Sequence, residues 1–346
     1  MSPVLTPSVP VQHGAKLVGN TDSVQTHTHM GKTGCELGKR LYAILPQRRY
    51  CIFFFFTIPV ETASEIATRL TAASRRKAWD VYNAFDWPAS LDSDRWCMPP
   101  EMISIFGTPA YDSLGDEQKK RLSLFEIGNF FSLVLQGERP LVQGLVHRLY
   151  ARSNSREITE YLHHFVDEEN KHMVMFGEFC NRYVGKVYPE KKIALTREYS
   201  KGEEEVAFFC KVMVVEELGD YYNVLIGRDE RVEPLVREIN RVHHIDEARH
   251  LAFGRLHLAE LWVRHLPAWS AETVSGFRAW LIEYVRASWG DYYNPTMYRD
   301  SGLADSYEIR QVALSHPACR AHRQRAAARL VAYFIKIGLL TEEPLL

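Results

Sequence analysis

The chain has 346 residues, of which 46% are hydrophobic and 12% aromatic, and its formal net charge is -1. This is the composition of a globular protein long enough to bury one large core or two smaller ones. A nearly neutral chain has no electrostatic basis for binding nucleic acid or an anionic membrane, so we expect neither partner and favour small-molecule chemistry. The six cysteines form no Cys-x-x-Cys pair, which favours free thiols and a cytoplasmic location.

The first 62 residues differ in composition from the rest of the chain. Ser, Thr, Gly and Pro are frequent up to residue 35, and an apolar run follows from Cys51 to Val60. That run is about half of the ~20 residues that a membrane-spanning helix needs. We therefore predict a largely disordered tail over 1–62 and one folded domain over 63–346. Whether the tail serves organelle targeting or belongs to the mature enzyme is left open.

Apolar residues recur every three or four positions through most of the remaining chain. This spacing predicts four long helices, over 118–152, 155–186, 203–229 and 231–266. Ser155 can cap the second helix, and the acids at 203–205 suit the positive end of the third helix dipole. We expect further helices over 267–290 and 318–338, a Pro-rich loop over 87–110, and no β-strand. The predicted class is all-α, with a four-helix bundle at its centre.

Two of the predicted helices carry the same short motif. In "HHFVDEENKH", Glu169 and His172 are three residues apart, so they share one face of a helix and could reach one metal ion. A single Glu-x-x-His occurs by chance about once in a chain of this size and is weak evidence alone. Glu247 and His250 repeat the motif in "HHIDEARH" on another helix. The repetition makes a metal site the better interpretation.

The other two long helices supply matching glutamates. Glu138 precedes Glu169 by 31 residues, and Glu216 precedes Glu247 by the same number. Two helix pairs that each give one Glu and one Glu-x-x-His are what a carboxylate-bridged dimetal centre in a four-helix bundle requires. Two divalent cations would also offset four buried carboxylates, which are otherwise costly to desolvate. Glu217 is the alternative to Glu216, and only the 31-residue separation favours Glu216.

Neighbouring residues could complete or support this centre. His243 lies four residues before Glu247 on the same stripe, so it could be a ligand or could hydrogen-bond to one. Asp246 and Glu168 could hydrogen-bond to the ligating imidazoles and raise their basicity, or could be exposed acids. Other titratable residues fall off this face and are expected to lie elsewhere: Glu126, His163, His164 and His244.

The order of these residues resembles that of the di-iron N-oxygenases typified by p-aminobenzoate N-oxygenase. The segment "VVEELGDYYNVLIGRD" is similar to the third-helix segment of that family, with Glu216 in the ligand position. The resemblance covers roughly residues 64–340 and implies a ferritin-like four-helix bundle with flanking helices. It implies seven iron ligands, namely Glu138, Glu169, His172, Glu216, His243, Glu247 and His250. Glu169 and Glu247 would then bridge the two metals.

The resemblance also implies a function. A non-haem di-iron monooxygenase of secondary metabolism would activate O2 and oxidise the nitrogen of a small amine, converting an aryl amine to a hydroxylamine, nitroso or nitro product. Two iron ions are expected, and manganese would also suit these ligands. Because the sequence has no flavin or nicotinamide motif, electrons would come from a reductase or ferredoxin. The substrate, the electron donor and the oligomeric state, including a homodimer, are left open.

Two other classes of function remain open at this point. Another di-iron oxidation, such as C–H hydroxylation, desaturation or aldehyde chemistry, would use nearly the same ligands. A non-catalytic ferritin-like metal-binding protein would need only the bundle and its acids. Four aromatic residues, Phe130, Phe131, Tyr221 and Tyr222, could either line a pocket for a flat substrate or fill the core.

Overall fold

The computed structural model describes residues 61–189, 195 and 197–346. Its helices are α1 (Ala63–Arg76), α2 (Pro109–Asp112), α3 (Asp116–Arg148), α4 (Arg156–Phe179), α5 (Glu203–Arg228), α6 (Pro234–His265), α7 (Ala271–Ser288), α8 (Pro295–Asp300), α9 (Ser306–Ser315) and α10 (Pro317–Lys336). Among the described residues, β-structure is limited to an isolated bridge between Trp96 and Val232. The all-α prediction is confirmed. The predicted tail, including Cys51 to Val60, lies outside the described residues except for its last two positions.

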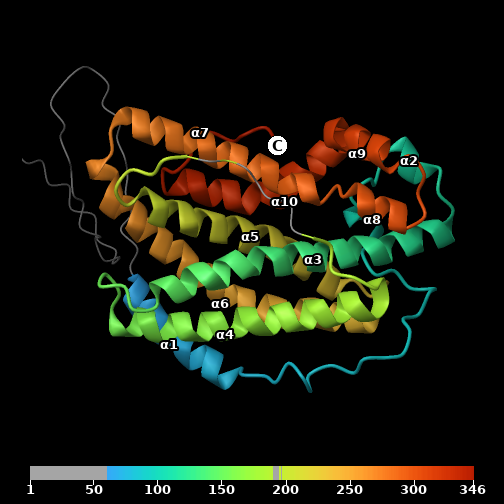
Figure 1. Cartoon of the computed structure of the whole chain (residues 1–346), viewed down its shortest axis with the longest axis horizontal. Helices are drawn as coiled ribbons and strands as arrows, with labels where there is room; N and C mark the ends of the chain where they lie inside the picture. The colour runs from blue at the N-terminus through green and yellow to red at the C-terminus, as the bar shows by residue number, and fades with distance from the viewer. Residues whose placement is uncertain (1–60, 190–194, 196) are drawn as a thin grey trace, which may run out of the picture. The chain divides into compact units, whose positions relative to one another are not determined.

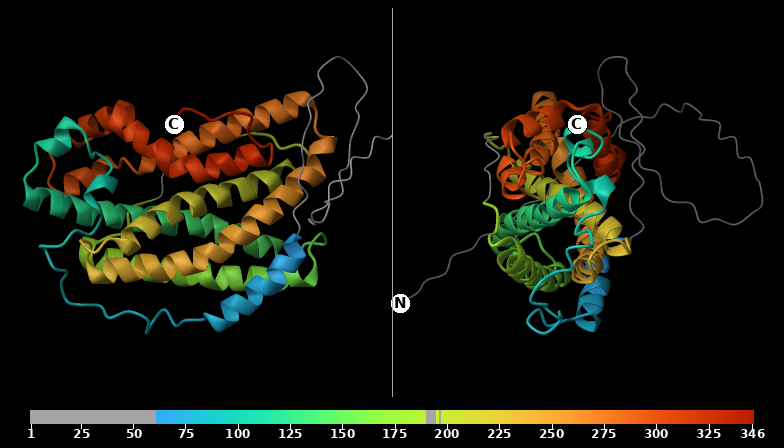
Figure 2. Two further views of the ribbon diagram at one scale, coloured as in Figure 1. Left: turned by 180° about the vertical axis from the view of Figure 1, so that it is seen from behind. Right: turned by 90° about the vertical axis from the view of Figure 1, so that its right-hand side faces the viewer.

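Four long helices form the centre of the fold (Figure 1). α3 packs against α4 and α5 packs against α6, and the two pairs contact each other through α3 with α5 and α4 with α6. α1 packs against α4 and α6, whereas α7 and α10 pack against α5 on the opposite side of the bundle (Figure 2). This is the four-helix bundle with flanking helices that the sequence predicts.

The helix ends follow ordinary capping chemistry. The predicted cap of α4 is present, since the Ser155 hydroxyl accepts a hydrogen bond from the Ile158 amide at 3.3 Å. Thr62 and Glu65 form a capping box that begins α1. A π-helical turn, Cys180–Val184, extends α4 and ends at Gly185, whose φ of 83° favours glycine. These caps fix where α1 and α4 start and stop beside α6.

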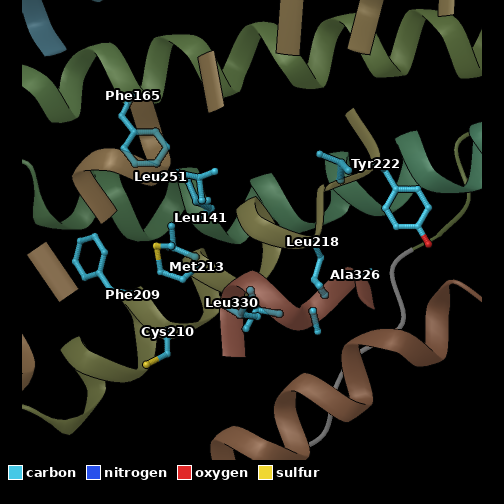
Figure 3. Packing of buried hydrophobic residues seen from close by; sticks show 14 of the residues in the cluster. Leu141, Phe165, Phe209, Cys210, Met213, Leu218, Tyr222, Leu251, Ala326 and Leu330 are labelled. Carbon is cyan, nitrogen blue, oxygen red and sulfur yellow. The ribbon is translucent and has the colours of Figure 1, made fainter. Parts of the chain in front are cut away.

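Apolar side chains from the four bundle helices and from α1, α7 and α10 share one core. Figure 3 shows Leu141, Met213 and Leu251 pointing into the bundle, while Ala326 and Leu330 of α10 face α5. None of the described helices combines the length and apolar character that a membrane span requires. Buried acids and histidines interrupt this apolar core at the middle of the bundle. This interruption is the feature that bears on function.

Candidate metal centre

The four bundle helices each direct acids or histidines into the core. α3 contributes Glu138 and α5 contributes Glu216. α4 contributes the pair Glu169 and His172, and α6 contributes the pair Glu247 and His250 together with His243. None of the seven predicted residues is more than 4% exposed. Their donor atoms form two groups, Glu138, His172, His243 and Glu247 in one and Glu169, Glu216, Glu247 and His250 in the other, each within 4.8 Å. The structure therefore brings together all seven residues that the sequence singles out.

Glu169 and Glu247 lie between the two groups. One oxygen of Glu169 is 2.7 Å from Nδ1 of His250, and the other is 3.5 Å from Nδ1 of His172. Oε1 of Glu247 is 2.8 Å from Nε2 of His243, and its Oε2 is 3.3 Å from Nδ1 of His250. Each of these two carboxylates thus presents a different oxygen to each side of the cluster, as a bridging carboxylate can.

The donor atoms that face the centre lack hydrogen-bond partners among the described residues. They comprise both carboxylate oxygens of Glu138, Glu169 and Glu247, one oxygen of Glu216, Nδ1 of His172 and His250, and Nε2 of His243. Buried polar atoms normally have partners, and each exception costs free energy. Carboxylate oxygens and imidazole nitrogens suit iron or manganese, and neither group contains a cysteine. Two divalent cations would satisfy these atoms, so the residues fit a dimetal cofactor.

The electrostatics of the cluster point the same way. Burial raises the pKa of Glu138 to about 7. Burial, with the charges of Glu247 and Glu169, also raises the pKa of Glu216 well above its ordinary value. Although burial opposes it, His250 and His243 hold the pKa of Glu247 well below the usual range. Bound cations would displace the protons that these raised pKa values favour on Glu138 and Glu216, which is the linkage expected of a metal site.

Outer carboxylates hold two of the imidazoles. Nε2 of His172 is 3.2 Å from Asp246, and Nε2 of His250 is 2.9 Å from Glu168. Arg249 contacts both acids, with Nη2 at 2.5 Å from Glu168. The indole N–H of Trp79 donates to Asp246 at 2.8 Å. The hydrogen bonds that the sequence suggested for Asp246 and Glu168 are thus present, and they turn both Nδ1 atoms toward the centre.

His243 is held differently. Its Nε2 faces the centre, and its Nδ1 lies 2.7 Å from the amide of Asn223. Sequence reasoning did not identify Asn223, although its position seven residues after Glu216 places it on the same face of α5. It also missed Trp79, which follows α1 in a loop, where residue spacing gives no prediction.

The two donor groups include neither Glu217, the alternative to Glu216, nor the residues expected to lie elsewhere. Glu217 points out of the bundle, where its carboxylate accepts a hydrogen bond from Arg255 Nε at 2.7 Å, so Glu216 is the acid at the cluster. Glu126 accepts from Ser104 near one end of α3. On the outside, His163 pairs with Tyr150, His244 lies beside Asp220, and His164 is only half-buried.

A pocket of about 340 Å³ lies between α3 and α5 and extends to α7. Its lining includes Gly137, Leu141, Lys211, Val215 and Tyr284. Gly137 and Val215 are the chain neighbours of Glu138 and Glu216, but none of the seven cluster residues is among the lining. The aromatic residues considered from the sequence are not among its lining, and Phe130 stacks on Tyr222 at 5.0 Å within the core.

The chain is similar to several known proteins. Uncharacterised proteins of Mycobacterium bovis and Mycobacterium tuberculosis are 26% identical over 205 residues, which is 56% of this chain and 60% of each relative. Two structures of R2-like ligand-binding oxidases, one of them a variant with a Mn/Fe cofactor, are 17% and 16% identical. Each alignment covers 75% of this chain and 92% of the oxidase, with TM-scores of 0.35 and 0.31. The family model of p-aminobenzoate N-oxygenase AurF matches residues 60–338, and the chain belongs to that family.

Proposed function

We propose that this protein is a non-haem dimetal oxygenase that oxidises the nitrogen of a small amine. The observation that carries the proposal is the pair of buried donor groups, which share Glu247 and whose inward-facing atoms lack partners among the described residues. Membership in the AurF family supports oxidative chemistry on an amine.

Each ligand has a distinct place in this proposal. Glu138, His172 and His243 would hold one metal (the first metal), Glu216 and His250 would hold the other (the second metal), and Glu169 and Glu247 would be shared between them. Two irons are the expected pair, with manganese as the other metal that these ligands suit. When bound, such a pair supplies the redox chemistry that activates O2.

The protein's own residues position this chemistry and keep water away from it. Asp246 and Glu168 fix the tautomers of His172 and His250, so that the lone pair of each Nδ1 faces the centre. The ring of Phe165 stacks on His250 at 3.9 Å, and Phe176 meets the ring of His243 at 4.9 Å. These contacts cover the outer faces of the imidazoles and limit access to the cluster from α4.

The pocket between α3 and α5 is the proposed substrate site. Its volume of about 340 Å³ suits a small molecule, and most of its lining is apolar. An aryl amine is neutral at pH 7 and keeps its nitrogen lone pair, whereas a protonated alkyl amine would have to be desolvated. Lys211, which also lines the pocket, would repel such a cation. We therefore favour an aryl amine as the substrate.

An external electron donor completes the proposal. Reduction of the metals requires electrons that the seven ligands do not supply, so a reductase or ferredoxin is the expected partner. A cytoplasmic location and a homodimer remain predictions from the sequence.

Metal content and product analysis test the proposal together. After anaerobic loading with Fe²⁺, we expect about two irons per folded chain. With a chemical reductant, O2 and p-aminobenzoate or a related aryl amine, we expect hydroxylamine, nitroso or nitro products. Two irons without any N-oxidised product would favour another di-iron oxidation. Loading far above two irons in a multi-subunit shell would indicate storage, and a folded protein that takes up no iron would overturn the proposal.

A further inference from the structure

The three imidazoles at the centre do not present the same nitrogen to it. His172 and His250 both face Glu169 through Nδ1, which is 3.5 Å from its carboxylate in His172 and 2.7 Å in His250. His243 faces Glu247 through Nε2 at 2.8 Å. Its Nδ1 therefore points away from the centre, toward Asn223 on α5.

This orientation determines where the proton of His243 must be. An imidazole that binds a metal through Nε2 is neutral and carries its proton on Nδ1, so Nδ1 must donate. Asn223 lies 2.7 Å from Nδ1, and its Oδ1 has no partner among the described residues. The two ends of an amide have the same shape, and the hydrogen-bond network decides which end faces a partner. A half-turn of the Asn223 amide brings Oδ1 to Nδ1 and pairs the donor with an acceptor.

The partners also differ in charge. His172 and His250 donate to the carboxylates of Asp246 and Glu168, and a carboxylate partner makes an imidazole a more basic ligand. Asn223 is a neutral amide that is 1% exposed. His243 is consequently the weakest of the three imidazole donors.

His243 belongs to the metal that would have the larger number of protein ligands. Each donor group has four members in the structure, and only Glu247 belongs to both. If Glu169 also bridged, the metal held by Glu138, His172 and His243 would have five protein ligands, and the metal held by Glu216 and His250 would have four. A coordination position is therefore harder to obtain on the first metal unless a ligand leaves it.

We propose that Asn223 is a positioning residue that makes His243 the labile ligand of the first metal. The neutral amide fixes the Nδ1–H tautomer of His243 without strengthening its bond to the metal. In the metal-loaded protein His243 would be the imidazole that exchanges most readily, whereas His172 and His250 would stay bound. This inference rests on the proposed dimetal function.

Metal release to a chelator tests the inference without any measurement of activity. We expect Fe²⁺-loaded wild-type protein, kept anaerobic, to lose one iron in a fast phase and the other in a slow phase. Asn223→Asp supplies a carboxylate partner, and we expect it to slow the fast phase about 10–100-fold. Asn223→Ala leaves Nδ1–H unpaired and should accelerate that phase. Asn129→Asp is the matched control, because Asn129 is likewise a buried asparagine but lies on α3, remote from the seven ligands.

The outcomes separate this inference from the proposed function. Failure of wild-type protein to bind two metal ions would overturn the function itself. Two bound irons with unchanged release from Asn223→Asp would overturn only the role of Asn223.

A second measurement does not depend on whether the variants fold. In Zn²⁺-loaded wild-type protein with ¹⁵N-labelled histidine, NMR reports which nitrogen of each imidazole carries the proton. We expect one cluster imidazole with its proton on Nδ1 and two with their protons on Nε2. The same tautomer at all three would overturn the inference.

Discussion

Helix α3 buries two glutamates in two different ways. Glu126 is 4% exposed and accepts hydrogen bonds from the amide of Ser104, at 3.1 Å, and from its hydroxyl, at 2.5 Å. Burial raises the pKa of Glu126 to about 8, so this acid is mostly protonated at neutral pH. Glu138, twelve residues later, lies instead among three other glutamates and three histidines, and its oxygens have no hydrogen-bond partner among the described residues.

The difference shows how the cost of burying an acid depends on the number of acids. A single carboxyl group avoids the desolvation cost by keeping its proton and accepting hydrogen bonds. Four carboxylates that face one another have too few donors for this solution, so cations must supply the positive charge. Burial alone therefore does not mark a metal ligand, whereas convergent unpartnered oxygens do.

The largest expected effect comes from removing the acid that both groups share. Glu247→Gln should reduce metal content from about two ions per chain to nearly none, because each metal loses a ligand and a negative charge. Elemental analysis after anaerobic loading measures the change. Glu126→Gln is the control, because Glu126 is a buried acid outside the cluster, and this variant should keep both metals. Retention of two ions by Glu247→Gln would contradict the bridging role.

The second prediction concerns pH and the protonated acid. In the folded protein the pKa of Glu126 is about 8, against about 4.5 when unfolded, so the native state binds the extra proton between these values. The free energy of unfolding should therefore fall by about 2–4 kcal/mol as pH rises from about 5 to 8. Glu126→Gln mimics the protonated acid and should remove this part of the loss. Chemical denaturation of both proteins at pH 5 and pH 8 measures it, and equal pH slopes would refute it.

A smaller loss of metal affinity is expected when a carboxylate that hydrogen-bonds to a ligating imidazole is replaced. Asp246→Asn keeps the shape of the His172 partner but removes its charge, and should weaken metal binding about 10–100-fold. A metal titration under anaerobic conditions measures the affinity. Asp220→Asn is the matched control, since Asp220 pairs with His244 outside the centre. Equal affinities for the two variants would mean that the Asp246 charge does not strengthen the His172 ligand.

Six of the seven cluster residues could be predicted from helix spacing, whereas His243 was left open by spacing and entered the set through the family resemblance. Residues three and four apart share a helix face, and the equal separation of the two motif pairs favoured Glu216 over Glu217. The supporting residues could not be found in this way. Trp79 reaches Asp246 from a loop, and Asn223 is recognisable only once His243 is seen to face it through Nδ1.

The limits of fold prediction have a similar cause. The long amphipathic helices were predicted within a few residues, since their apolar periodicity extends over many turns. No separate helix was predicted for α1, α8 or α9. For α8 and α9 the reason is length, because six and ten residues give too little periodicity to distinguish a helix from a loop. The Pro-rich region 87–110 is largely loop, as expected, but a short 3-10 turn, Pro100–Met102, and the start of α2 lie within it.

The smallest expected effect tests two adjacent glutamates of α5 against each other. Glu217 is 3% exposed and pairs with Arg255, which is 34% exposed at its side chain, so the ion pair lies at the edge of the bundle. Glu217→Gln should lower the free energy of unfolding by only about 1 kcal/mol and leave both metals bound. Glu216→Gln, one residue earlier, should instead release the second metal, since Glu216 is the only ligand in the proposed set that α5 supplies. Chemical denaturation and elemental analysis of the two variants separate these effects. Loss of metal from Glu217→Gln rather than Glu216→Gln would reverse the assignment, because only the acid that faces the cluster can replace water on a cation.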